Sequence, residues 1–219
     1  MRPNILYLHG FASSPGGTKA SAFRERLAAR GLTLHVPDLN VPDFEHLTLT
    51  AMIEAAAEAV RQCPPGPVYL IGSSLGGFTA LHFLDRRRAA EAQRVERLVL
   101  IAPALAFLGR HSVALGAEVM AQWQARGWLP VYHDGYQRQM RLRHDLVEDL
   151  RDYSGGFDVA LDIPTLIFHG RRDESVDYRL SERFARDRDN VTLRLFDSDH
   201  RLLDCVDAMW EEMVVFFDL

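Results

Sequence analysis

The stretch that most constrains the fold runs from Val68 to Gly77 and reads Val-Tyr-Leu-Ile-Gly-Ser-Ser-Leu-Gly-Gly. It opens with four apolar residues after a proline-rich loop, which is typical of a buried parallel strand. Gly72, Ser74 and Gly76 then fit the G-x-S-x-G pattern, in which a strained turn between a strand and a helix holds a serine hydroxyl above a sheet. Ser74 is therefore the candidate nucleophile.

The pattern alone also fits an ordinary turn between a strand and a helix, because Gly and Ser are common turn residues. The rest of the chain supplies the context that the motif needs. Short apolar segments alternate with helical patterns, and strands are expected at residues 4–8, 32–36, 68–72, 97–101, 165–168 and 191–196. Helices are expected at residues 18–30, from 48 or 50 to 62, 75–88, from about 178, and 203–217. This alternation predicts an α/β fold with a mainly parallel sheet covered by helices on both faces.

The alternation fails between residues 103 and 160. An amphipathic helix is expected near Ser112 to Arg126, a hairpin around the Asp134-Gly135 turn signal, and a short acidic helix near Asp145 to Tyr153. The segment is too long for a plain crossover between strands. We expect one α/β domain spanning residues 1–219, with residues 103–160 inserted as a small lid.

Charge and hydropathy exclude several classes of function. The net charge is −5 and basic residues are scattered among acidic ones, so we expect no nucleic-acid partner. No apolar run approaches the roughly 18 residues of a membrane span, so we expect no membrane insertion. The chain begins Met1-Arg2-Pro3 and enters its first expected strand at Asn4, which leaves no room for a signal peptide and predicts a cytoplasmic protein.

Two residue types carry little functional signal in the sequence. Cys63 and Cys205 lie far apart without metal-ligand spacing, which favours packing as small hydrophobes, and we expect no metal or organic cofactor. Lys19 is the only lysine in the chain, and against so many arginines this indicates a biased genome composition rather than a site.

A serine hydroxyl is a weak nucleophile, so Ser74 needs a base within hydrogen-bond reach and a third group that orients the base. Asp173 follows the strand expected at residues 165–168, and His200 follows the strand expected at residues 191–196. The chain order Ser, Asp, His is the one that accompanies the G-x-S-x-G turn. All three residues then lie at the carboxyl edge of one parallel sheet, where open α/β sheets bind ligands.

Each assignment has a competing interpretation. His200 could instead be a loop histidine bonded to Asp197 or Asp199. Glu174 and Asp177 lie beside Asp173, but Glu174 is expected to face away and Asp177 to cap the next helix.

Two other histidines stand at the ends of expected strands. His9 is interpreted as bracing the loop after the first strand, and His169 as part of the turn that presents Asp173.

Acyl transfer also needs N–H donors for the negative charge that develops on the attacked carbonyl. Leu75 directly follows the nucleophile and offers its backbone N–H at a helix start, and the second donor should come from the loop after the first strand. Phe11 is placed for that role, with Ala12 as the second choice.

These motifs together resemble the α/β-hydrolase superfamily, and within it the small bacterial esterases of the YqiA type. The matching segments are Tyr7-Leu8-His9-Gly10-Phe11, Gly72-Ser73-Ser74-Leu75-Gly76-Gly77, His169-Gly170-Arg171-Arg172-Asp173-Glu174-Ser175-Val176 and Ser198-Asp199-His200-Arg201-Leu202. The resemblance covers nearly the whole chain apart from residues 103–160. It implies six strands in the order 2-1-3-4-5-6, and it places Ser74, Asp173 and His200 at the triad positions.

The expected function is hydrolysis of small carboxylic esters with short or medium acyl chains, through an acyl-enzyme. A thioesterase, lactonase or acyltransferase would use the same triad. A ligand-binding protein on a hydrolase fold is a different class of alternative, although binding does not require a complete triad. Phe107, Trp123 and Trp128 suggest an apolar acyl pocket, or equally a lid that packs on the sheet. The sequence allows either a monomer or a homodimer.

Overall fold

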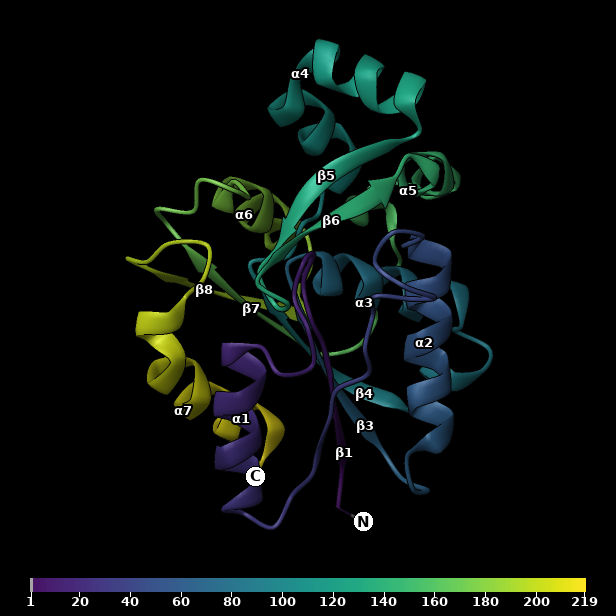
Figure 1. The fold of residues 1–219 in the computed structure, drawn as a ribbon. Coiled ribbons are helices and arrows are strands. Elements are labelled where there is room, and N and C mark those ends of the chain that lie inside the picture. Colours follow the sequence, from purple (N-terminus) through teal and green to yellow (C-terminus); the bar gives the residue numbers. More distant parts are fainter. Residues whose placement is uncertain (1) are drawn as a thin grey trace.

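The computed structural model describes residues 2–219, without the side chains of residues 108–115. Its centre is one parallel sheet of six strands (Figure 1). The strands are β1 (Asn4–Leu8), β2 (Leu34–His35), β3 (Val68–Ser73), β4 (Val95–Ile101), β7 (Thr165–Gly170) and β8 (Val191–Phe196). Their order is β2-β1-β3-β4-β7-β8, which is the expected order 2-1-3-4-5-6 when only the strands of this sheet are counted. The predicted α/β-hydrolase fold is confirmed.

The strand register brings the functional loops to one edge. Leu8 pairs with Gly72 and Ser73 with Ile101, so β1, β3 and β4 end side by side. Further along the sheet, Gly170 at the end of β7 pairs with Phe196 at the end of β8. Because parallel strands all point the same way, the loops that follow them meet at the carboxyl edge of the sheet.

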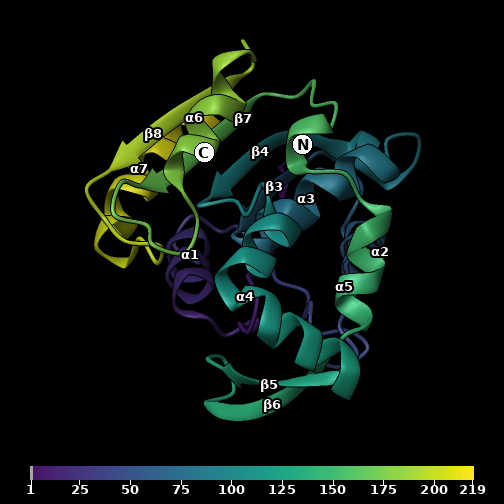
Figure 2. The ribbon, with the colours of Figure 1, turned by 90° about the horizontal axis from the view of Figure 1, so that it is seen from above.

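Helices cover both faces of the sheet, as the alternating pattern predicts (Figures 1 and 2). One face is packed by α1 (Thr18–Ala28) and α7 (Val206–Phe217), through buried residues such as Phe23 and Met209. The other face is packed by α2 (Leu49–Gln62), α3 (Leu75–Arg86) and α6 (Tyr178–Arg186). With both faces covered, all six residues of β3 are buried, which explains its unbroken apolar run.

Local signals fix several helix ends. The Thr48 hydroxyl accepts a hydrogen bond from the Ala51 N–H at the start of α2. The α1 helix ends two residues earlier than expected, before Gly31 adopts a φ of 68°. The second strand is also shorter than expected, because it pairs over only two residues with β1 at the sheet edge. Short 3₁₀ turns complete the described elements, at Glu91–Arg94, Leu150–Asp152, Gly156–Asp158 and Leu203–Cys205.

Residues 103–160 lie above the carboxyl edge of the sheet (Figure 1). They form α4 (Phe107–Arg126), an antiparallel hairpin of β5 (Trp128–His133) and β6 (Arg138–Arg143), and α5 (Asp145–Asp149). The hairpin and the short acidic helix match the expectation, whereas the long helix starts earlier than the expected Ser112. It is interrupted at Gly116, whose φ of 79° is not helical. We call residues 103–160 the lid.

Over residues 2–219, no helix combines the length and the apolar character that crossing a lipid bilayer requires.

Candidate active site

Ser74 occupies a strained turn between β3 and α3. Its φ of 53° and ψ of −116° lie where non-glycine residues rarely fall. The turn is tight: a Cβ added at Gly76 would lie 2.1 Å from the Leu8 carbonyl oxygen, so only glycine fits there. Hydrogen bonds hold the strained residue, since the Ser74 N–H donates to Ile101 O over 2.9 Å and its carbonyl accepts from the Ala104 N–H. This is the geometry of a nucleophile elbow.

The structure brings Ser74, His200 and Asp173 together from three separate loops. His200 Nε2 lies 3.1 Å from Ser74 Oγ, and His200 Nδ1 lies 2.6 Å from Asp173 Oδ2. A carboxylate can only accept, so Nδ1 carries the proton and Nε2 presents its lone pair to the Ser74 hydroxyl. The arrangement can therefore take a proton from the serine as it attacks.

Asp173 is completely buried as a side chain and is satisfied by four donors. Its Oδ1 accepts from the Ser175 and Val176 N–H groups at 2.8 and 2.7 Å. Its Oδ2 accepts from His200 and, over 3.1 Å, from His169 Nε2. Burial acts to raise the pKa of Asp173, but the hydrogen bonds from the two histidines and the backbone outweigh it and hold the pKa far below its usual value. The group therefore stays an anion beside His200.

His169 has a more specific place than a turn residue. Its Nε2 faces two acceptors, Asp173 Oδ2 and the Val176 carbonyl oxygen, so this nitrogen carries a proton. Its Nδ1 lies 2.7 Å from the hydroxyl of the buried Ser181 in α6. Sequence reasoning missed this link, although a histidine four residues before the acid across a turn was a signal that could have found it.

The competing interpretations of the neighbouring residues are resolved by the structure. Asp199 Oδ1 accepts from the backbone N–H groups of Arg201 and Leu202, and His200 is bonded to Asp173 instead. Glu174 is exposed. Asp177 caps α6 by accepting from the Arg179 N–H, as expected.

His9 is buried, and its Nε2 accepts from the Leu39 N–H over 3.0 Å. It thus braces the loop after β1 against the segment after β2, as expected.

The two expected oxyanion donors lie on either side of Ser74. Leu75 begins α3 directly after it. The loop after β1 approaches closely, because a Cβ added at Gly10 would lie 3.3 Å from Ser74 Cβ, and Phe11 follows at once. The role of these N–H groups stays a prediction.

A cavity of about 490 Å³ opens beside Ser74 and His200. Its walls come from the loop after β1, the start of α1, the loop after β8 and the hairpin tip. Most lining side chains are polar or charged, among them Ser13, Lys19, Gln137 and Arg201. Lys19 and the hairpin tip were missed by sequence reasoning, which treated the lone lysine as composition.

Phe107, Trp123 and Trp128 are not among the residues that line this cavity. Trp123 is buried within the lid and donates from Nε1 to the Leu142 carbonyl over 3.0 Å. The Trp128 ring lies under the Arg126 guanidinium, whereas Phe107 is buried with its ring 6.3 Å from that of Phe11. An apolar acyl pocket built from the three stays a prediction.

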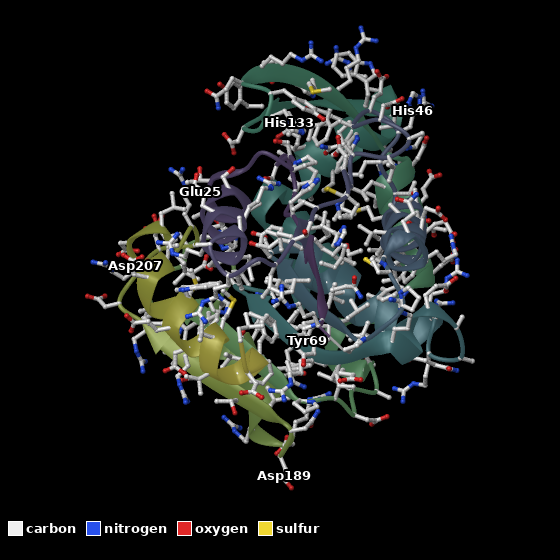
Figure 3. The ribbon with its side chains drawn as sticks, turned by 90° about the horizontal axis from the view of Figure 1, so that it is seen from below. Glu25, His46, Tyr69, His133, Asp189 and Asp207 are labelled. Atoms are coloured by element: carbon white, nitrogen blue, oxygen red, sulfur yellow. The ribbon has the colours of Figure 1, made fainter. Side chains whose placement is uncertain are left out.

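The hairpin is fastened to the body of the protein at its tip. Tyr136 donates from its hydroxyl to Asp38 over 3.1 Å, and its ring stacks on His133 at 4.1 Å. His133 is completely buried between the hairpin and the body (Figure 3), with Nε2 3.3 Å from Asn40 Oδ1. The Gly135 N–H also donates to the Ala12 carbonyl. The hairpin tip therefore closes the outer wall of the cavity.

Over the described residues, no group of three or more His, Cys, Asp or Glu side chains is placed to hold a metal ion.

Comparison with known proteins places the fold of this chain among the α/β hydrolases. A family profile described as "Uncharacterised protein family (UPF0227)" matches residues 4–218. The bovine (Bos taurus) protein named "Palmitoyl-protein thioesterase ABHD10, mitochondrial" is 24% identical over 216 residues, covering 94% of this chain and 69% of that protein.

Solved structures show the same fold. Mouse "Alpha/beta hydrolase domain-containing protein 10" superposes with a TM-score of 0.81 at 22% identity, covering 100% of this chain and 90% of that one. A protein from Agrobacterium vitis S4 gives a TM-score of 0.84 at 26% identity, covering 98% of this chain and 87% of that one.

Proposed function

Since the chain belongs to the UPF0227 family and has the α/β-hydrolase fold, we propose that it is a serine hydrolase that cleaves small carboxylic esters. One observation carries the proposal: the continuous hydrogen-bonded line from Ser74 Oγ through His200 to the buried Asp173. A binding protein has no need of a strained serine joined to a base and an orienting carboxylate.

In the proposed reaction Ser74 Oγ attacks the ester carbonyl while its proton passes to His200 Nε2. The N–H groups of Phe11 and Leu75 stabilise the tetrahedral oxyanion. When the intermediate collapses, the bond to the alcohol breaks and His200 returns the proton to the leaving oxygen. A water molecule, deprotonated by His200, then cleaves the acyl-enzyme and frees the acid and Ser74.

The proposal is tested by hydrolysis of p-nitrophenyl esters from acetate to decanoate. Ser74→Ala should lower kcat by on the order of 10³-fold or more, the size expected when a triad member is removed. Ser154→Ala is the matched control, because this serine is exposed on the lid. Wild-type protein that cleaves none of these esters and no thioester, or a Ser74→Ala variant that keeps the activity, contradicts the proposal.

A thioesterase is the second candidate, favoured by the similarity to a relative whose name is that of a palmitoyl-protein thioesterase. The same serine would attack a thioester carbonyl, and His200 would protonate a leaving thiolate instead of an alkoxide. Comparing kcat/KM for an oxygen ester and a thioester of the same acyl group separates the two activities. A preference for the thioester of tenfold or more would make it the main function.

A further inference from the structure

The only lysine of the chain lines the active-site cavity. Lys19 is the second residue of α1, and its side chain borders the same cavity as Ser74 and His200. Its Nζ donates to the Arg201 carbonyl oxygen over 2.8 Å. Because Arg201 directly follows His200, the ammonium group is bonded to the loop that carries the proposed base.

This ammonium group has spare hydrogen-bonding capacity. An ammonium has three N–H donors, and within the part of the chain that the structure describes, no carboxylate lies within ion-pair distance of Lys19 Nζ. Burial lowers the pKa of Lys19 to about 8; the Arg201 charge adds to that effect, whereas Asp199 and Asp173 oppose it. A partly buried cation without a carboxylate partner is costly for the protein, and an anion in the cavity offsets that cost.

The other charges around the cavity do not supply that anion. Asp173 is already saturated by its four donors, and the Asp199 side chain bonds backbone N–H groups of its own loop. Asp134 is exposed at the hairpin tip, and Arg201 adds a second cation. The titratable or charged groups that line the cavity with Lys19, or act on its charge, are Tyr7, His9, Asp134, Asp173, Asp199, His200 and Arg201.

We propose that Lys19 binds a carboxylate carried by the alcohol part of the substrate, so that the enzyme prefers esters whose leaving group is anionic. The assignment to the leaving group follows from two observations: His200 hands its proton to the leaving oxygen, and Lys19 lines the same cavity and is bonded to the residue that directly follows His200. This inference rests on the proposed ester hydrolysis. It gives the polar and charged residues of the cavity wall a role that an apolar acyl pocket would not explain.

A structural role for Lys19 makes a different prediction. Its bond to the Arg201 carbonyl also steadies the loop that holds His200. If that were its whole role, removing the ammonium would slow every ester by the same factor. Two substrates that differ only in charge therefore separate the two roles.

The test compares 4-acetoxybenzoate with 4-acetoxybenzamide, which release phenols of nearly equal shape, one anionic and one neutral. Wild type, Lys19→Met and Lys19→Arg are assayed for kcat/KM on both. Arg30→Gln is the control, because it removes one positive charge from the exposed region just beyond the far end of α1.

We expect wild type to favour the benzoate. Lys19→Met should lose roughly tenfold or more on it, mainly through KM, as one charge-assisted hydrogen bond implies. In Lys19→Met, kcat/KM for 4-acetoxybenzamide should change by less than about twofold. Lys19→Arg should keep part of the preference for 4-acetoxybenzoate.

The pH dependence of the substrate preference is a second test, and in wild type it leaves the Lys19 side chain in place. The benzoate preference of wild type should decline as the pH rises through about 8, because Lys19 loses its proton, whereas Lys19→Arg should keep its ratio constant. This measurement decides the question if Lys19→Met does not fold, which circular dichroism would show.

Two outcomes overturn the inference. If the ratio of kcat/KM for the two substrates is unchanged in Lys19→Met, as an equal loss on both would give, Lys19 does not select charge. A pH-independent ratio in wild type shows the same. In these cases hydrolysis of the acetate esters 4-acetoxybenzamide and p-nitrophenyl acetate still supports the proposed function. Failure of wild type on all of these esters instead removes the proposed ester hydrolysis and the inference with it.

Discussion

The loops at the sheet edge and the outer surface of the lid hairpin are held by different forces. The Asp173 side chain has no exposed surface and all its acceptors are used within the site. In the lid hairpin, by contrast, Trp128 is half-buried under the exposed Arg126 and Arg141 guanidinium groups. Exposed cation–π contacts such as those of Trp128 contribute only about 0.5–1 kcal/mol each to stability. The contacts at the sheet edge therefore fix the arrangement of Asp173 and His200 more firmly than the surface contacts fix Trp128.

The largest expected effect is on the sheet side, at the carboxylate. Asp173→Asn should lower kcat for p-nitrophenyl acetate by roughly 10³- to 10⁴-fold, because an amide N–H₂ would meet histidine N–H donors and the imidazole would lose its tautomer. Glu174→Gln is the matched control and should keep full activity, since that side chain is exposed. Equal activity of the two variants would contradict the proposed role of Asp173.

The Asp173→Asn substitution should also change how the free energy of unfolding depends on pH. The pKa of Asp173 is depressed in the folded state, so its carboxylate stabilises the fold above its unfolded value of about 3.9 and loses this contribution as the pH falls below it. The gap in unfolding free energy between wild type and Asp173→Asn should therefore be widest near neutral pH and shrink below about pH 4. Urea unfolding at several pH values measures it.

An intermediate effect is expected at His169, one step behind the reacting groups. His169→Ala should lower kcat by roughly tenfold or more while KM changes little, since a charge-assisted hydrogen bond to Asp173 is lost. Without that donor the Asp173 charge acts more fully on His200. The acid limb of the kcat/KM profile should therefore move to higher pH.

His169→Gln is the conservative control, because its amide can still donate to Asp173 and should restore part of the rate. A loss of stability without any shift of the pH profile would show that His169 only packs the turn.

This contrast also explains what the sequence could predict. The order and positions of Ser74, Asp173 and His200 follow from strand ends that are read from apolar or alternating segments, and parallel register then forces those ends to one edge. Nothing about long-range side-chain packing is needed for that step.

The lid and the cavity walls depend on such packing. The pattern around Trp123 says only that an apolar face is buried somewhere, and the acceptor of its indole, the Leu142 carbonyl, becomes visible only in the folded hairpin. Sequence analysis attributed the single lysine to a biased genome composition, because a count of residues does not say where in the fold Lys19 lies. Its place at the start of the first helix, at the same sheet edge as Ser74, was the usable signal.

The smallest expected effect lies on the lid surface. Trp128→Ala should change kcat/KM for p-nitrophenyl acetate and decanoate by less than about twofold and the unfolding free energy by about 1 kcal/mol, because only surface cation–π contacts are lost. Trp123→Ala, its buried counterpart, should cost about 3–5 kcal/mol of unfolding free energy.

A selective loss of tenfold or more on decanoate in Trp128→Ala would show instead that the lid surface receives the acyl chain. The lid surface would then take part in substrate choice together with the cavity at the sheet edge, and the apolar acyl pocket expected from the sequence would have to be placed beneath the hairpin.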